Sequence, residues 1–187
     1  VYFLPFLWFL IRYRLPAGLT GRLAILFVLG GLQGVLGWYM VKSGLVDQPS
    51  VSQYRLAAHL GLAVIIYAAM LYTALGLRTV DRRGTSVSRG ARNLSILIFI
   101  TMIWGALVAG MDGGAVFTTF PLMDGQLVPP GYFDSPTAPF EDHATIQFHH
   151  RVLALVSFAL IVWVWWQSRW LALVPRARRA ANVLLAA

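Results

Sequence analysis

The chain contains no cysteine among its 187 residues. Its sequence therefore excludes thiolate metal sites, cysteine-held iron–sulfur clusters and disulfides. Charge is also scarce, because only 12% of the residues are charged and 7 acidic residues stand against 15 lysines and arginines. The sequence has no HExxH motif, no glycine-rich phosphate loop and no Ser–His–Asp pattern. Any metal ligand must therefore be sought among its few histidines and carboxylates.

Apolar residues, by contrast, make up 58% of the chain, above the roughly 45–50% of a soluble domain. They form long runs, and a membrane-spanning helix needs about 20 residues. Four complete runs predict four transmembrane helices, at residues 23–41, 56–77, 94–111 and 146–167. The predicted fold class is an all-α membrane protein, a polytopic transmembrane helix bundle. Incomplete apolar runs at both ends suggest a fragment cut inside a helix at each end.

The loops between these runs alternate in charge. Arginine is in excess in loops 12–22, 78–92 and 168–179, whereas loop 112–145 has five acidic residues and neither lysine nor arginine. The positive-inside rule places the three basic loops on the cytoplasmic or matrix side and loop 112–145 outside. We therefore read the net charge of +8 as a sign of membrane topology, with the lipid bilayer as partner and no nucleic acid.

The outer loop 112–145 is long and contains prolines, glycines and several aromatic residues. Loops of this length are usually functional or disordered, and a disordered segment would lack aromatics. We expect it to pack as a lid over the outer ends of the helices. Asp112 and Asp124 could chelate a cation, but a solvated acidic loop is the favoured interpretation.

The first candidate site is His59, which lies just inside the outer end of the run 56–77. An ionisable side chain at that depth is costly and usually functional, and imidazole is a common axial ligand of haem iron. Arg55 lies one turn nearer the water on the same helix face, where its guanidinium would suit a haem propionate. Ala57, Ala58 and Gly61 leave room beside the imidazole. The alternative is a histidine hydrogen-bonded to a neighbouring helix.

The second candidate site opens the run 146–167 on the same outer side. Gln147 and His150 share a helix face, while His149 points about 100° away. Arg151 again lies beside the histidine, although it could simply anchor the helix at the headgroups. His143 precedes His150 by seven residues and shares its face only if the helix extends that far back.

Several stretches taken together resemble the haem A synthases of α-proteobacteria and mitochondria. They are GGLQG at 30–34, GWYMVKSGL at 37–45, YRLAAHL at 54–60, WGALVAGMDGG at 104–114, TFPLMDG at 119–125 and QFHHR at 147–151. The resemblance implies an eight-helix enzyme of the bacterial cytoplasmic (inner) membrane, or of the mitochondrial inner membrane, built from two four-helix repeats. Such an enzyme oxidises a methyl group of haem O to a formyl group, which makes haem A for cytochrome oxidase.

On this resemblance the chain is an internal fragment. Residues 1–92 would hold the end of helix 2 with helices 3 and 4, and residues 93–187 would hold helices 5 and 6 with the start of helix 7. His59 becomes the helix-four iron ligand of the first half, which handles haem O. His150 becomes the helix-six iron ligand of the second half, which holds haem b.

On the hypothesis of a haem site, Arg55 and Arg151 would hold propionates at the water boundary, while His143 and His149 have no assigned role. The family's candidate catalytic glutamate, in Glu-x-x-His-Arg, would lie upstream of Val1, and another histidine ligand would lie beyond Ala187. We therefore expect this fragment alone to be inactive. The electron acceptor, a homo-oligomer, and contacts with haem O synthase or cytochrome oxidase assembly factors stay open.

Two other functions remain as alternatives. One is a di-haem b-type electron-transfer cytochrome of the membrane, and the other is a non-haem transporter or assembly factor. The sequence sign of a transporter would be broken helices, with paired glycine or proline interruptions at the membrane midplane. The glycines at 30, 31, 34 and 37 instead favour a helix-packing face.

Overall fold

A computed structural model describes residues 2–13, 15–44, 51–77, 86–132, 135–171, 173 and 175–186. Within that part of the chain, the regular structure is helical apart from one isolated antiparallel bridge between Met123 and Gln126. The chain divides into two compact units, Val1–Arg82 and Arg83–Ala187. Each unit is described by itself below.

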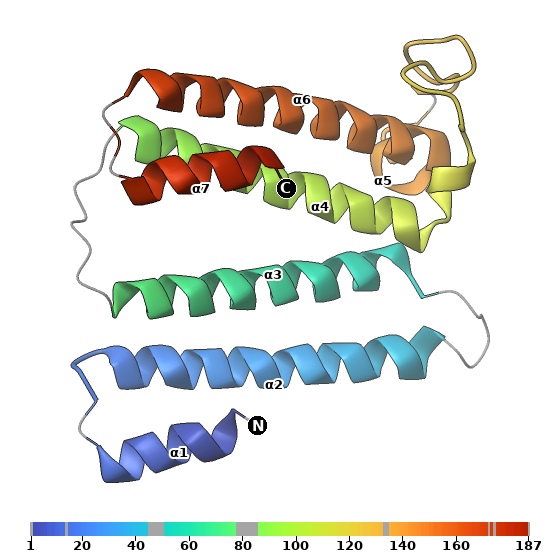
Figure 1. Cartoon of the computed structure of the whole chain (residues 1–187). Coiled ribbons are helices and arrows are strands. Elements are labelled where there is room, and N and C mark those ends of the chain that lie inside the picture. Colours follow the sequence, from blue (N-terminus) through green and yellow to red (C-terminus); the bar gives the residue numbers. More distant parts are fainter. Residues whose placement is uncertain are drawn as a thin grey trace. The chain divides into compact units, whose positions relative to one another are not determined.

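The first unit contains α1 (Phe3–Arg12), α2 (Leu19–Gly44) and α3 (Gln53–Gly76). Helices α2 and α3 pack side by side, and α1 rests against α2 (Figure 1). The hydroxyl of Tyr2 donates to the carbonyl oxygen of Leu23 at 2.9 Å, which ties the start of α1 to α2. The α2–α3 contact is the element that positions His59.

The second unit contains α4 (Ser86–Gly110), the short 3₁₀ helix η1 (Gly113–Ala115), α5 (Ala138–Glu141), α6 (His143–Trp170) and α7 (Pro175–Ala186). Helices α4 and α6 form its main contact (Figure 1). The hydroxyls of Thr101 on α4 and Ser157 on α6 lie 3.0 Å apart and form a hydrogen bond between the helices. Small hydroxyl residues let membrane helices approach and bond in this way.

Local chemistry sets the ends of α4 and α6 on the side of the outer loop. Asp112, just after α4, has a φ of 52°, a left-handed conformation that aspartate tolerates better than most residues. Asp142 is the N-cap of α6, and its carboxylate accepts the backbone N–H of Thr145 at 2.7 Å. The negative charge of this carboxylate also stabilises the helix, because it lies at the positive end of the helix dipole. The cap fixes where the helix carrying His150 begins.

The prediction of four spanning helices is confirmed, because α2, α3, α4 and α6 are each long and apolar enough to cross a bilayer. Large hydrophobic side chains lie exposed along them, as expected for helices whose surroundings include lipid or further helices. The chain is therefore a polytopic helical membrane protein.

The predicted boundaries were too short. The structure extends α2 to residues 19–44, α3 back to residue 53, α4 back to residue 86 and α6 to residues 143–170, and it places residues 175–179 in α7, although these added residues were assigned to loops. The outer loop accordingly ends at Asp142 rather than at residue 145. The helices continue past their apolar cores because long charged side chains such as Arg89 and Arg169 keep their head groups exposed there. Other charges used in the orientation argument lie outside the described residues: Arg14, Asp47, Arg78, Asp81, Arg82, Arg83 and Asp134. The orientation stays a prediction.

Candidate functional site

His150 projects from α6 toward α4. Its Nδ1 lies 3.2 Å from the backbone carbonyl oxygen of Thr101. A carbonyl oxygen only accepts hydrogen bonds, so Nδ1 must carry the ring proton and the lone pair of the neutral imidazole sits on Nε2. Nε2 has no hydrogen-bond partner among the described residues. This tautomer, with Nδ1–H bonded to a carbonyl, is the one typical of a metal-ligating histidine.

Gly105 makes this contact possible. A Cβ atom built on Gly105 would lie 3.0 Å from Cε1 of His150 and 3.5 Å from its Nδ1. Gly105 follows Thr101 by four residues and therefore lies on the same face of α4. Its missing side chain lets the imidazole lie flat enough against the helix to reach the Thr101 carbonyl.

An apolar cavity of about 450 Å³ adjoins His150. Its volume falls in the range of small-molecule and cofactor sites, which are mostly apolar with a few polar groups. Its lining comes from α4, α6 and α7: Ile98, Thr101, Met102, His150, Ala154, Ser157, Phe158, Ile161 and Leu184. The arrangement offers one lone-pair nitrogen beside an apolar hollow.

His59 on α3 contacts α2 in a related way. The side-chain nitrogen of Gln33 lies 3.2 Å from Nε2 of His59 and donates to the His59 carbonyl oxygen at 3.1 Å. A Cβ atom built on Gly37 would lie 3.2 Å from Cε1 of His59. Nδ1 of His59 is buried without a hydrogen-bond partner among the described residues. Gly37 of α2 thus leaves room for this imidazole, a contribution that was not predicted from the sequence.

The two arginines have partners of their own. Arg55 lies over the ring of Tyr39, 5.0 Å from its centroid, in a cation–π contact. Arg151 donates from its two terminal nitrogens to the carbonyl oxygens of Phe117 and Thr119, at 2.6 Å each. Arg151 therefore holds the outer loop against α6. A role for either arginine at a propionate stays a prediction.

His149 faces away from His150 and toward the outer loop. Its Nε2 lies 2.9 Å from the hydroxyl of Tyr132, and its ring meets that of Trp104 edge-on at 6.3 Å between centroids. His143, the first residue of α6, is exposed. The helix does extend back to His143, but within the described residues no three histidines, aspartates or glutamates come together as a cluster able to hold a metal ion. Asp112 and Asp124 accordingly belong to no such cluster.

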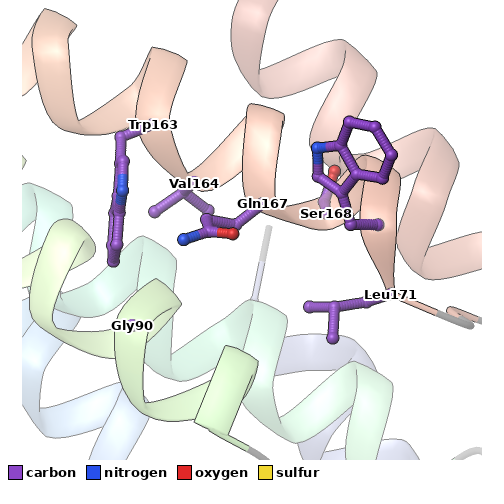
Figure 2. A pocket seen from close by; sticks show the side chains of 7 residues that line it. Gly90, Trp163, Val164, Gln167, Ser168 and Leu171 are labelled. Atoms are coloured by element: carbon purple, nitrogen blue, oxygen red, sulfur yellow. The ribbon is translucent and has the colours of Figure 1, made fainter.

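A second cavity, of about 310 Å³, lies at the other end of α6 (Figure 2). Trp163, Val164, Gln167 and other α6 side chains line it, and Gly90 of α4 faces them. It includes none of the histidines. Tryptophans at this end, near Arg169, match the interfacial aromatic belt of a membrane helix.

The whole chain, residues 1–187, matches the COX15-CtaA family, described as cytochrome oxidase assembly protein. The chain belongs to this family. It is 46% identical over 181 residues to the "Heme A synthase" of Parvibaculum lavamentivorans, covering 94% of this chain and 53% of that protein. It is 45% identical over 196 residues to the "Heme A synthase" of Nitrosospira multiformis, covering 98% of this chain and 54% of that protein.

The chain thus spans about half the length of the curated relatives it matches. The "Heme A synthase" of Wolbachia pipientis is also similar, at 42% identity over 171 residues, which is 87% of this chain and 49% of that protein. No solved structure matches the chain. The family resemblance seen in the sequence is confirmed.

For this COX15-CtaA chain, sequence reasoning found both histidines but missed the residues that contact them. Gln33 gave a usable signal, because it is the one amide or charged group in the apolar run 23–41 and polar groups at membrane depth are costly. Thr101 gave none, since it acts through its backbone carbonyl. The predicted helix-packing role of the glycines is realised at Gly37, whereas a Cβ on Gly30, Gly31 or Gly34 would meet no described atom within 4 Å.

Gln147 is the buried side chain that joins the outer loop to α6. Its carbonyl accepts the backbone N–H of Phe117 at 3.1 Å, and its amide donates to the carbonyl oxygens of Gly114 and Phe117 at 3.1 and 3.0 Å. Gln147→Leu would remove three hydrogen bonds between α6 and the outer loop, each worth about 0.5–1.5 kcal/mol, although the Phe117 carbonyl would keep its bond from Arg151. We expect faster proteolysis within loop 112–142, measured by limited digestion of protein in proteoliposomes. Gln167→Leu, at an exposed position on the same helix, is the control and should not alter the cleavage rate.

Proposed function

We propose that the complete protein is a haem A synthase, which oxidises a methyl group of haem O to a formyl group. Support comes from the family match, from the name of the curated relatives, and above all from the His150 site. That site combines a lone-pair imidazole nitrogen, a fixed tautomer and an adjoining apolar cavity. The combination suits a haem better than it suits a transported polar solute.

The residues present fit a haem. His150 would hold the iron of a resident haem b through Nε2, and His59 would be the ligand for haem O as substrate. Bound haem b supplies one-electron transfer, which the protein tunes through ligation and surroundings. The two histidines are proposed here as iron ligands, and no bare metal ion is required.

The chain's own groups have three tasks in this proposal. The Thr101 carbonyl keeps the proton on Nδ1 of His150 and so keeps Nε2 available. The apolar lining of the cavity would give a bound haem an apolar contact surface beside His150. The outer loop, bonded to Gln147 and Arg151, covers the end of α6 near His150. Arg55 and Arg151 would bind propionates at the outer boundary, the latter by exchanging its loop carbonyls for a carboxylate.

The proposed location is the bacterial cytoplasmic (inner) membrane, or the mitochondrial inner membrane in a eukaryote. The proposed product is haem A for cytochrome oxidase. Conversion of a methyl to a formyl group removes electrons and adds an oxygen atom, so it requires an electron acceptor and an oxygen donor from outside the chain; a haem b held by His150 would supply one-electron transfer. Haem O synthase and oxidase assembly factors are the partners that this chemistry implies, and a homo-oligomer is compatible with it.

The deciding experiment is conversion in a host that makes haem O but lacks its own haem A synthase. The protein expressed from its complete coding sequence should cause haem A to appear in acid-acetone extracts separated by chromatography. A purified protein with a reducible haem b spectrum but no haem A in the host would favour a b-type electron-transfer cytochrome. A purified protein with no Soret band would favour a non-haem transporter or assembly factor. Either result would overturn the proposal.

A further inference from the structure

Gln33 forms a hydrogen bond with Nε2 of His59, the nitrogen that would ligate haem iron. Its side-chain nitrogen lies 3.1 Å from the His59 carbonyl oxygen, which can only accept. The group at that distance must therefore be the NH₂ and not the amide oxygen. The same NH₂ lies 3.2 Å from Nε2 of His59, so Nε2 is the acceptor and its lone pair is already engaged.

The two histidines thus share a tautomer but differ in access to their lone pairs. In both, the ring proton sits on Nδ1 and a glycine of the neighbouring helix lies against Cε1, Gly37 for His59 and Gly105 for His150. His150 donates a hydrogen bond from Nδ1 to a backbone carbonyl of α4, which leaves Nε2 without a competitor among the described residues. His59 instead accepts a hydrogen bond at Nε2 from the side chain of Gln33.

The Gln33 amide is also only partly satisfied. Its oxygen Oε1 is buried and has no hydrogen-bond partner among the described residues. A buried acceptor without a partner carries a desolvation penalty, so the two hydrogen bonds that the amide loses when its side chain turns away are offset in part by relief of Oε1. Gln33 is therefore a weakly held competitor rather than a rigid part of the helix contact.

We propose that Gln33 is a positioning residue that competes with haem iron for Nε2 of His59 and so keeps ligation at His59 readily reversible. The inference rests on the proposed function and deepens it. The substrate haem must leave as haem A once it is converted, whereas haem b stays; among the described residues a side-chain competitor is present at His59, which is assigned to the exchanging haem, and not at His150. Gln33 also holds His59 in the ligating tautomer between turnovers.

The test compares haem release from variants of the protein expressed from its complete coding sequence. Purified protein in detergent is mixed with excess apomyoglobin, and transferred haem O and haem b are separated by chromatography. In Gln33→Leu we expect haem O to leave about three- to tenfold more slowly, which is the value of one lost hydrogen-bond competitor. Haem b release should not change. Gln167→Leu, which removes an amide from an exposed position of α6, should leave both rates unaltered.

A purely structural role for Gln33 predicts the opposite sign. Losing the bond to the His59 carbonyl would then loosen His59, and haem O would leave faster as the melting temperature falls. Faster or unchanged haem O release in Gln33→Leu would overturn the inference, whereas slower release with an equal or lower melting temperature supports it.

Two further measurements, on His59→Ala and in the conversion assay, distinguish failure of the competitor role of Gln33 from failure of the proposed function. If haem A forms and His59→Ala lowers haem O content, an unchanged Gln33→Leu rate refutes the competitor role alone. If His59→Ala leaves haem O content unchanged, the site at His59 and the inference fail together. If no haem A forms in the host, the proposed function fails with them.

Discussion

His150→Ala is expected to remove haem b from the protein expressed from its complete coding sequence. Among the described residues that line the cavity beside α4 and α6, His150 is the only one with a side-chain nitrogen, and the variant loses it. Partners that merely orient a metal ligand are worth about 10–100-fold in affinity. Loss of the ligand itself should therefore weaken haem b binding by more than about a hundredfold. The Soret absorbance and the extracted haem b per protein measure the effect.

His149→Ala is the matched control for this prediction. His149 is the adjacent residue on the same helix, but it bonds Tyr132 of the outer loop and does not line the cavity. The control should keep its haem b and lose only loop stability. Exogenous imidazole should partly restore the spectrum of His150→Ala, because the vacated space beside Gly105 admits a ring. Retention of haem b by His150→Ala, with an unaltered Soret band, would refute the assignment.

The fold was predictable where membrane physics decides it. A run of about 20 apolar residues has few alternatives to a spanning helix, and all four predicted spans exist. The ends were harder, because α4 and α6 continue through residues such as Arg89 and Arg169 whose charges do not stop a helix at the interface. Asp142, whose carboxylate caps α6, marks the start of that helix better than the apolar pattern does, but it did not enter the prediction.

The candidate site, like the fold, was predictable from the sequence only in part. A histidine inside an apolar run is conspicuous, so His59 and His150 could be singled out from residue type and depth alone. The roles of their neighbours depend on which helix faces point together, and this cannot be read from one sequence. Arg151 illustrates the difficulty: its role at a propionate stays a prediction, and its bonds to two loop carbonyls could not be read from the sequence.

The two histidine sites share one arrangement of residues on the neighbouring helix. On α2 the residues are Gln33 and Gly37, and on α4 they are Thr101 and Gly105, in each case one helical turn apart. The glycine admits the imidazole, and the residue one turn earlier supplies the polar partner. The two units thus orient a histidine by the same backbone geometry but with different chemical groups. The proposed exchange of haem O at one site and retention of haem b at the other would follow from that difference.

Gly105→Ala tests this arrangement at the second site. The added methyl would lie 3.0 Å from Cε1 of His150, closer than nearly all real contacts of a Cβ atom. The ring must then move by a few tenths of an ångström, which lengthens its 3.2 Å bond to the Thr101 carbonyl. We expect haem b affinity to fall about 10–100-fold, the value of an outer partner of a metal ligand. The midpoint potential of any residual haem b should also change, because the proton on Nδ1 is less firmly bonded.

Gly90→Ala makes the same substitution on the same helix, where a Cβ would meet no described atom within 4 Å. Replacing a mid-helix glycine by alanine stabilises a helix by roughly 0.5–1 kcal/mol, so this control should bind haem b normally and melt slightly higher. The pair therefore separates helix propensity from the space beside His150. If Gly105→Ala kept both its haem b and its midpoint potential, the imidazole would not depend on the gap at Gly105, and His150 would have to be oriented by groups other than α4.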